Sequence, residues 1–144
     1  MILIADTSGI IAASERGAAE GAACRALLGE AGTVVVSPLV LAEVDHMAKA
    51  RFGSAARSTI IAFILAQARR SRFHLPQITD EILAAACSVQ QRYSGLDLDL
   101  ADGVNVVLAA EYRTDAVLSL DRRDFRAMRP LTSHKSFRLL PDDL

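Results

Sequence analysis

Short apolar segments alternate with longer, helix-like segments along the whole chain, and this alternation limits the folds open to it. Residues 2–5, 33–36 and 116–120 are apolar runs of strand length. Residues 38–52 and 54–71 have the length and the apolar spacing of helices. Strands that have no polar face must be covered on both sides. The pattern therefore predicts an α/β fold in which a short, mostly parallel sheet lies between two layers of helices.

A single domain accounts for the whole sequence. The chain has 144 residues, the size of about one domain, and no linker rich in Pro, Gly or Ser divides it. We therefore expect residues 1–144 to fold as one unit. The other expected helices are residues 7–14, 18–29, 80–93, 102–113 and 122–128, and the weaker strands are 73–75 and 137–140.

The cysteines and the apolar segments favour an intracellular protein. Cys24 and Cys87 are isolated in Ala-rich stretches, without the CxxC or Cys/His spacing of a metal site. Sparse cysteines are typical of a reducing compartment. The start of the chain lacks the basic segment of a signal peptide, and residues 60–66, the longest apolar stretch, are too few to span a membrane. We expect a cytoplasmic protein with no membrane association.

Positive charge is concentrated in arginine and in particular segments. The formal net charge is only −1, but 14 of the 16 basic side chains are Arg. No acid lies between His46 and Thr79, whereas that segment contains six basic residues. Arg suits bidentate contacts with phosphate, so such segments could bind nucleic acid. The alternative is that they are ordinary solvated helix faces.

Four acids occupy positions where a carboxylate needs an explanation. Asp6 and Asp121 each follow an apolar run. Glu43 interrupts the apolar stripe of a helix, and Asp102 opens a helix that is otherwise almost wholly apolar. Sites in parallel sheets form at the carboxyl ends of strands, so these acids would converge if the first strand and the late strand are neighbours. Packed carboxylates repel unless a cation compensates, and oxygen ligands favour Mg²⁺ or Mn²⁺, which points to metal-assisted hydrolysis of phosphodiesters.

The aspartates also have an ordinary explanation, because Asp is a common N-cap. Asp6, Asp102 and Asp121 could each accept hydrogen bonds from free N–H groups at a helix start. Position alone does not separate Asp102 from its acidic neighbours. We nevertheless expect four nearby acids to stay outside the site: Asp45, Asp97, Asp99 and Asp124.

Glu43 is harder to explain as a surface residue. It lies three residues after Val40 and four before Met47, at the edge of the stripe expected to be buried. A buried carboxylate there needs a hydrogen bond, a counter-charge or a metal. The alternative is an exposed acid at the rim of that stripe.

Four sequence blocks contain these acids. They are residues 6–8 (DTS), 37–44 (SPLVLAEV), 100–109 (LADGVNVVLA) and 118–125 (LSLDRRDF). In this order and spacing they resemble the motifs of PIN-domain nucleases, and the chain is similar in length and motifs to the VapC toxins of bacterial VapBC pairs. Two residues depart from the usual pattern, Gly103 in place of Ala and Ser119 in place of Thr, and neither change removes an acid. The resemblance implies a PIN-like three-layer α/β/α fold.

The resemblance also implies a role for each acid. Asp6 and Asp102 would be the primary ligands of Mg²⁺, with Mn²⁺ as a possible substitute. Glu43 and Asp121 would complete the site. A cation held in this way promotes the attack of water on an RNA phosphorus.

Further residues would support the acids or bind the substrate. Ser8 and Ser119 would hydrogen-bond the carboxylates or a phosphate. Arginines near the site would contact RNA phosphates. They are Arg69, Arg70, Arg72, Arg122, Arg123 and Arg126.

The resemblance implies partners as well. VapC-like toxins form homodimers, and a cognate VapB-type antitoxin lays its C-terminal segment across the active-site groove. DNA would be reached only through the antitoxin. The substrate would be structured RNA, either tRNA loops or the sarcin–ricin loop of ribosomal RNA, and cleavage would inhibit translation.

Two other hypotheses stay open at this point. Asp6 could be the nucleophile of an aspartyl-phosphate phosphotransfer domain, although Ser8 stands where such folds use a second Asp. Alternatively, the chain could be a catalytically inactive PIN module that only binds RNA or protein. The presence of all four acids argues against an inactive module.

Overall fold

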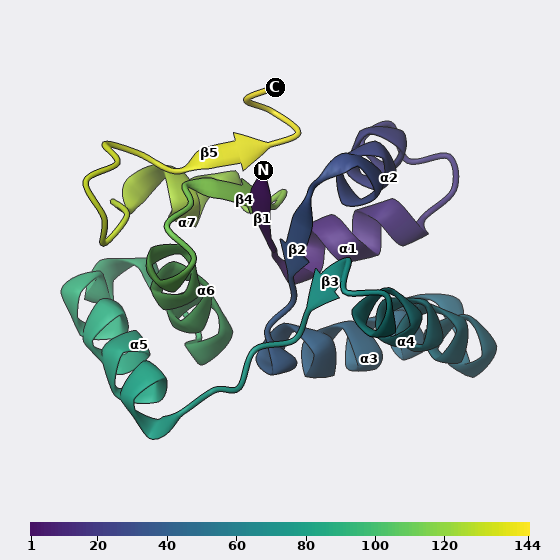
Figure 1. The fold of residues 1–144 in the computed structure, drawn as a ribbon, viewed down its shortest axis with the longest axis horizontal. Coiled ribbons are helices and arrows are strands. Elements are labelled where there is room, and N and C mark those ends of the chain that lie inside the picture. The colour runs from purple at the N-terminus through teal and green to yellow at the C-terminus, as the bar shows by residue number, and fades with distance from the viewer.

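The computed structural model describes residues 1–144 and centres on a five-stranded sheet in which all neighbouring strands are parallel. Helices cover both faces of this sheet, so the predicted α/β fold with three layers is confirmed (Figure 1). None of the helices has the length and apolar character needed to cross a lipid bilayer. In chain order the elements are β1 (Ile2–Ala5), α1 (Thr7–Ser14), α2 (Gly21–Glu30), β2 (Thr33–Val35), α3 (Pro38–Phe52), α4 (Ser54–Arg69), β3 (Phe73–His74), α5 (Asp80–Arg92), the 3₁₀ turn η1 (Ser94–Leu96), α6 (Leu100–Glu111), β4 (Ala116–Leu118), α7 (Arg122–Ala127) and β5 (Arg138–Leu140).

The order of the strands creates a crevice at one edge of the sheet. The strand order is β3-β2-β1-β4-β5. The chain therefore adds β2 and β3 on one side of β1, and then adds β4 and β5 on the other side. Strands β1 and β4 are direct neighbours, with Ala5 paired to Leu118. In open parallel sheets the crevice at such a reversal, at the carboxyl ends of the strands, is the usual binding site. The segments that follow β1 and β4 therefore meet there.

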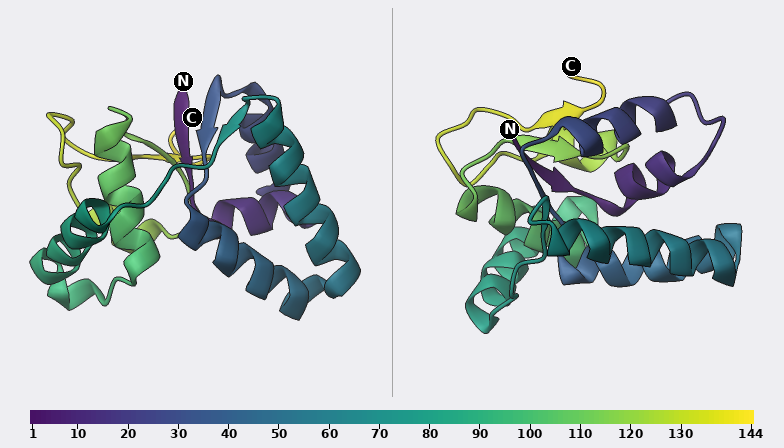
Figure 2. Two further views of the ribbon diagram at one scale, coloured as in Figure 1. Left: turned by 60° about the horizontal axis from the view of Figure 1, so that its bottom comes forward. Right: turned by 45° about the vertical axis from the view of Figure 1, so that its right-hand side comes forward.

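Side chains of each strand alternate between two apolar cores. Leu3 and Ala5 belong to the core beneath α1, α2, α3 and α4, whereas Ile4 between them belongs to the core beneath α5, α6 and α7. In β4 the same alternation separates Leu118 from Val117. The two views of Figure 2 show helices on both faces of the sheet. Because both faces are covered, the core on each side is apolar. This explains why the strands are unbroken apolar runs in the sequence.

Two element boundaries differ from the prediction in ways that affect the site. Helix α6 begins at Leu100 instead of Asp102, because Asp99 caps its first turn. Strand β4 ends at Leu118, since the paired segments of both neighbouring strands end at that level. Asp121 is therefore reached through a short connection and does not follow the strand directly. The other predicted elements agree with the structure to within three residues at each end.

Gly103 lies where α6 packs closely on α5. A Cβ atom at this position would lie 2.8 Å from the carbonyl oxygen of Ala86 and 3.2 Å from its Cβ atom. Backbone atoms of a packed helix cannot move aside at little cost, so an Ala here would push the two helices apart. This contact gives a physical reason for the Gly that departs from the usual PIN pattern.

Candidate active site

Asp6 is the most deeply buried acid of the crevice. It occupies the N-cap position of α1, but its side chain makes no capping hydrogen bond, so capping does not account for it. Its carboxylate accepts hydrogen bonds from Ser119 Oγ (2.8 Å), Ser8 Oγ (3.4 Å) and Asn105 Nδ2 (3.3 Å). The residue is only 6% exposed. Burial raises the pKa of Asp6, although the hydrogen bond from Ser119 opposes the shift.

Asn105 is a site residue that was not expected from the sequence. It is fully buried in the middle of α6 and donates Nδ2 to Asp6. Its Oδ1 is buried without a hydrogen-bond partner. Leaving a buried carbonyl unpaired costs roughly 1–3 kcal/mol. The signal in the sequence was an amide within an apolar helix, one turn after Asp102 and on the same face.

Glu43 is half-buried and is fixed by a hydrogen bond from the helix that follows β1. Thr7 Oγ1 donates to Glu43 Oε1 at 2.9 Å. Burial raises the pKa of Glu43, and the charges of Asp99 and Asp6 raise it further. The expectation that Met47 is buried beside it is wrong, because Met47 is 37% exposed. The hydrogen bond from Thr7, the residue that follows Asp6, nevertheless places the Glu43 carboxylate at the crevice.

Asp102 lies in the first turn of α6 and not at its cap. Asp102 N–H donates to Asp99 Oδ1 (2.9 Å), and Asp99 N–H donates to Asp102 Oδ2 (3.3 Å), so the two residues form a reciprocal capping box. Burial and then the charges of Asp99 and Asp6 raise the pKa of Asp102 to about 8. Asp99, which was expected to stay outside the site, therefore lies in direct contact with Asp102.

Asp121 and Asp124 bring two further carboxylates to the same place. Asp121 caps α7 by accepting from Asp124 N–H at 3.4 Å, so the capping explanation holds for Asp121. Capping does not remove it from the site, because carboxylate oxygens of Asp102, Asp121 and Asp124 all lie within 4.8 Å of one another. Burial and the charge of Asp121 raise the pKa of Asp124. Asp124, expected to lie outside, is thus a member of the closest acidic group.

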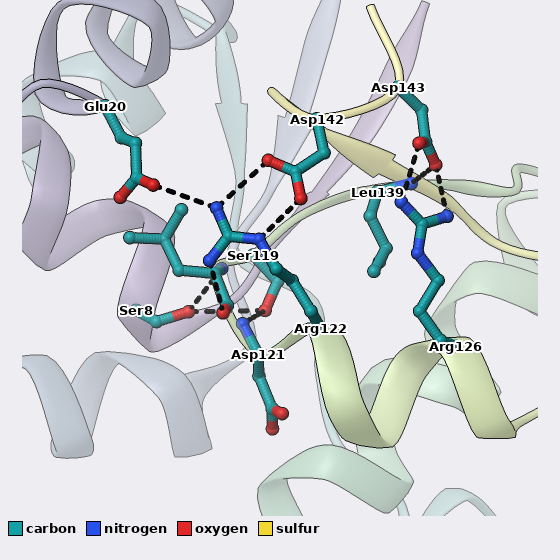
Figure 3. A network of polar contacts seen from close by, with 10 residues as sticks. Ser8, Glu20, Ser119, Asp121, Arg122, Arg126, Leu139, Asp142 and Asp143 are labelled. Atoms are coloured by element: carbon teal, nitrogen blue, oxygen red, sulfur yellow. Dashed lines mark hydrogen bonds and ion pairs between the residues drawn. The ribbon is translucent and has the colours of Figure 1, made fainter.

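Ser8 and Ser119 tie the segments after β1 and β4 together. Ser119 Oγ donates to Asp6 Oδ2 and accepts from Asp121 N–H at 3.0 Å. Ser8 Oγ lies 3.2 Å from Ser119 Oγ and accepts from Leu120 N–H at 2.9 Å. The contact between the two serines and the hydrogen bond from Asp121 N–H to Ser119 are drawn in Figure 3. The two serines thus fix both the buried acid and the backbone that carries Asp121.

The crevice has many carboxylates and no basic partner. No Lys, Arg or His side chain forms an ion pair with any of these acids, whereas acids elsewhere do form such pairs. An oxygen-only set of ligands suits a hard divalent cation, which would also offset the repulsion between neighbouring carboxylates. The unpaired Oδ1 of Asn105 adds a further oxygen without a partner. We refer to the following acids together as the acidic crevice: Asp6, Glu43, Asp99, Asp102, Asp121 and Asp124.

Comparison with known proteins assigns the chain to a family. The PIN domain family model matches residues 3–129. Ribonuclease VapC26 of Mycobacterium tuberculosis (strain ATCC 25618 / H37Rv) is 32% identical over 130 residues, which are 90% of this chain and 93% of that protein. The chain belongs to the VapC-type PIN-domain nucleases.

Solved structures agree with this assignment at the level of the fold. Mycobacterium tuberculosis VapC20, described as a sarcin–ricin loop cleaving toxin, superposes with a TM-score of 0.73 at 17% identity, covering 84% of this chain and 91% of that one. A toxin–antitoxin complex from Klebsiella pneumoniae gives a TM-score of 0.62 at 19% identity, covering 92% of this chain and 98% of that one. The VapC-type protein described here therefore has the PIN fold over most of its length.

The predicted RNA-binding arginines of this VapC-type protein fall into different environments. Arg69 and Arg70 precede β3, so they lie at the amino edge of the sheet, opposite the acidic crevice. Arg72 donates its NH2 group to carbonyl oxygens at the end of α2, which makes it a helix cap. Arg122 and Arg126 are held in ion pairs. The positions and partners of these five arginines therefore do not support the prediction that they contact RNA phosphates near the acidic crevice.

Arg123 is the remaining predicted arginine and differs from its neighbour Arg122. It is exposed and forms no ion pair with an acid. Its positive charge lowers the pKa of Asp124, opposing the larger effects of burial and of Asp121. Arg123 is therefore the arginine of this set that is both free and close to the acidic crevice.

Proposed function

We propose that this VapC-type protein is an endoribonuclease that depends on Mg²⁺, with Mn²⁺ as a substitute. The observation that carries the proposal is the group of three carboxylates within 4.8 Å of one another and without a basic partner. A divalent cation bound among these acids would neutralise their charge at neutral pH. RNA is proposed as the substrate because the 32% identical relative is a ribonuclease.

The roles proposed for the acids follow their positions. Asp6 and Asp102 would hold the cation, and Glu43 and Asp121 would support it. The charge of Asp6 raises the pKa of both Glu43 and Asp102, which supports a central position for Asp6. Asp124 joins this set through its closeness to Asp121. A divalent cation here would supply Lewis acidity toward the phosphate and lower the pKa of an attacking water.

The chain's own side chains would keep the site rigid. The hydrogen bonds from Ser8, Ser119 and Asn105 fix the orientation of the Asp6 carboxylate, so little reorganisation is needed when a cation and a phosphate bind. Arg123 would contact an RNA phosphate near the scissile bond. The capping box holds Asp102 at a fixed position on α6.

Structured RNA is the substrate class that we propose, with inhibition of translation as the result. The sarcin–ricin loop of ribosomal RNA is the first candidate, because VapC20 is described as cleaving it and has a similar fold. tRNA loops are the second candidate. The loop can be tested directly as a short RNA hairpin.

A VapB-type antitoxin is the proposed partner, consistent with the toxin–antitoxin complex among the similar structures. A groove of about 730 Å³ between α1, α2 and α4 offers a place for part of it. Apolar side chains such as Ile60 and Phe63 line this groove, and Arg16, Arg25 and Arg70 flank it, which suits an amphipathic segment with acidic residues. We further propose a homodimer, cytoplasmic location, and contact with DNA only through the antitoxin.

The two alternative hypotheses have less support. A phosphotransfer site of this kind uses a second Asp two residues after the nucleophile, and here that position is Ser8, whose hydroxyl donates to Asp6. An inactive binding module would not need to keep unpaired carboxylates together at the cost of their repulsion. RNA binding without cleavage at any divalent cation would nevertheless favour the inactive module.

The deciding experiment is cleavage of a sarcin–ricin loop hairpin and a tRNA by the purified protein. We expect Mg²⁺ to start cleavage, EDTA to stop it, and Asp102→Asn to abolish it while the fold is retained. Asp45→Asn is a matched control, since Asp45 pairs with Arg57 on the α3–α4 side and lies outside the acidic crevice. Undiminished cleavage by Asp102→Asn, or cleavage in EDTA, would contradict the proposal.

A further inference from the structure

Arg122 follows Asp121 directly, yet its guanidinium group is occupied within the protein. Nε and NH2 donate to the two carboxylate oxygens of Asp142 at 2.5 and 3.0 Å. NH2 also donates to Glu20 Oε1 at 2.9 Å, and NH1 donates to the carbonyl oxygen of Leu120 at 3.4 Å. Four of the five N–H donors of an arginine are thereby used (Figure 3).

These contacts join three segments that are far apart in the sequence. Glu20 precedes α2, Arg122 begins α7, and Asp142 follows β5 at the end of the chain. Strand β5 pairs with β4 and ends beside Leu118, which brings Asp142 to the edge of the sheet where α7 begins. A bidentate pair of this kind fixes the direction of the guanidinium plane as well as its distance.

A second ion pair joins the segment after β5, the C-terminal tail that also contains Asp142, to the last turn of α7. Arg126 NH1 and NH2 donate to the two carboxylate oxygens of Asp143, each at 2.6 Å. We refer to the residues of both pairs as the tail cluster: Glu20, Arg122, Arg126, Asp142 and Asp143. Because its acids outnumber its arginines, the tail cluster offers no excess positive charge to a phosphate. An RNA phosphate could bind Arg122 only by displacing a carboxylate that already holds it.

The tail cluster and the acidic crevice lie on opposite sides of the same short backbone segment. Leu120 N–H donates to Ser8 Oγ, and Asp121 N–H donates to Ser119 Oγ. The carboxylate of Asp121 points away from the guanidinium of Arg122 in Figure 3. Arg122 thus holds the segment from one side while Asp121 projects from the other side toward Asp102.

Asp121 needs such an anchor because of its neighbours. Its carboxylate lies with those of Asp102 and Asp124, all within 4.8 Å, so a small displacement of its backbone would remove it from this group. Helix α7 has only six residues and cannot fix the position of its first turn by length alone. The backbone hydrogen bonds to the two serines and the contacts of Arg122 are what oppose this movement.

We propose that Arg122, held by Asp142 and Glu20, is a positioning residue that fixes Asp121 in the active site, and that it is not an RNA contact. The last residues of the chain then contribute to catalysis without touching the substrate. This inference rests on the proposed metal-dependent nuclease function. It assigns different roles to two adjacent arginines, since Arg123 is the one left free for RNA.

The test compares kcat and KM of RNA cleavage for matched single variants. We expect Arg122→Gln and Asp142→Asn to lower kcat about tenfold with KM for RNA unchanged, since a misplaced active-site group lowers the rate of the bound complex. Asp142→Glu keeps the ion pair and should restore most of kcat. Arg123→Gln should instead raise KM severalfold with little change in kcat.

Two controls separate positioning from a loss of folding. Asp143→Asn breaks the pair at the far end of α7, so it should lower kcat by less than Asp142→Asn at a similar melting temperature. Asp45→Asn breaks a remote ion pair and should leave kcat unchanged. Equal losses of kcat in Asp142→Asn and Asp143→Asn, in proportion to their melting temperatures, would overturn the proposal.

Further outcomes decide between the two roles of Arg122. A higher KM at constant kcat for Arg122→Gln, together with a lower KM for Asp142→Asn, would show an RNA contact that the tail competes for. Mn²⁺ affinity measured by calorimetry gives a readout without RNA, and Asp142→Asn should weaken it severalfold. If the wild-type protein binds Mn²⁺ but does not cleave RNA, the proposed nuclease function is contradicted. If Asp142→Asn binds Mn²⁺ as tightly as the wild type does, the positioning role of Arg122 is contradicted, whatever the nuclease activity.

Discussion

The acidic crevice and the tail cluster lie on either side of one backbone segment and differ in their supply of arginine. In the tail cluster the hydrogen bonds from Arg122 lower the pKa of Asp142, and those from Arg126 lower the pKa of Asp143 to about 2. In the acidic crevice, burial and neighbouring acids raise the pKa of Asp102 to about 8. The same chemical group is shifted in opposite directions because its neighbours differ.

This difference shows which acids already have a partner of opposite charge within the protein and which do not. The tail acids have partners of opposite charge and contribute to structure. The acids of the crevice have hydrogen-bond donors behind them but no cation, so their charge is available to a ligand. An arginine placed in the crevice would pair with these acids and remove that property.

The largest effect is expected from removing a charge in the crevice. Asp102→Asn and Asp6→Asn should each lower RNA cleavage by at least about a thousandfold, the scale of losing an electrostatic group at a reacting phosphate. Initial rates on the hairpin substrate measure this. Asp143→Asn, also the loss of one carboxylate, serves as the comparison and should retain most of the activity.

A divalent cation should stabilise the crevice and leave the tail cluster unaffected. At a concentration of a hundred times its Kd, Mg²⁺ should raise the melting temperature by roughly 6–10 °C, from about 2.7 kcal/mol of binding linkage. Thermal denaturation with and without EDTA measures the shift. Asp102→Asn should lose most of it, and a full shift in that variant would place the cation elsewhere.

The pH dependence of stability should have opposite signs in the two regions. The folded pKa of Asp102 is raised from 3.8 to about 8, so the metal-free protein should lose stability as the pH rises between those values. The pKa of Asp143 is lowered to about 2, so its contribution is present above the ordinary Asp pKa and is lost as the pH falls toward 2. Melting curves in EDTA from pH 4 to 8 should show the first trend, and Asp102→Asn should flatten it.

The smallest effect on the melting temperature is expected from breaking the Arg126–Asp143 ion pair of the tail cluster. Arg126 and Asp143 are exposed, and exposed ion pairs contribute little to stability. Arg126→Gln should lower the melting temperature by only about 2 °C or less. A large drop would mean that the tail is a major determinant of the fold and not mainly an anchor for α7.

The fold and the centre of the site could be predicted from the sequence because both depend on local pattern. Apolar runs identified the strands, and an acid after each of β1 and β4 pointed to their shared edge. Asp124 and Asn105 were missed because their places depend on where helices begin and which way they face. The capping of α6 by Asp99, which lies before the predicted helix, shows how a shift of two residues changes the role of an acid.

The arginines were the least predictable part of the site. Arg72 meets carbonyl groups at the end of α2, and Arg122 meets acids from both ends of the chain. Such partners lie many residues away, so no periodicity or spacing around an arginine reveals them. An arginine that follows an active-site acid is therefore weak evidence for RNA contact.

Calorimetric titration of Mn²⁺ into the metal-free protein tests the central claim most directly. At pH 7 we expect one saturable site and a net release of protons, because the pKa of Asp102, raised to about 8, leaves that carboxyl mostly protonated until a cation binds. Measuring the heat in two buffers of different ionisation enthalpy gives the number of protons. Binding should be lost in Asp102→Asn and retained in Asp143→Asn. Equal affinity in wild type and Asp102→Asn, or no binding in either, would contradict the claim that the acidic crevice is a divalent cation site.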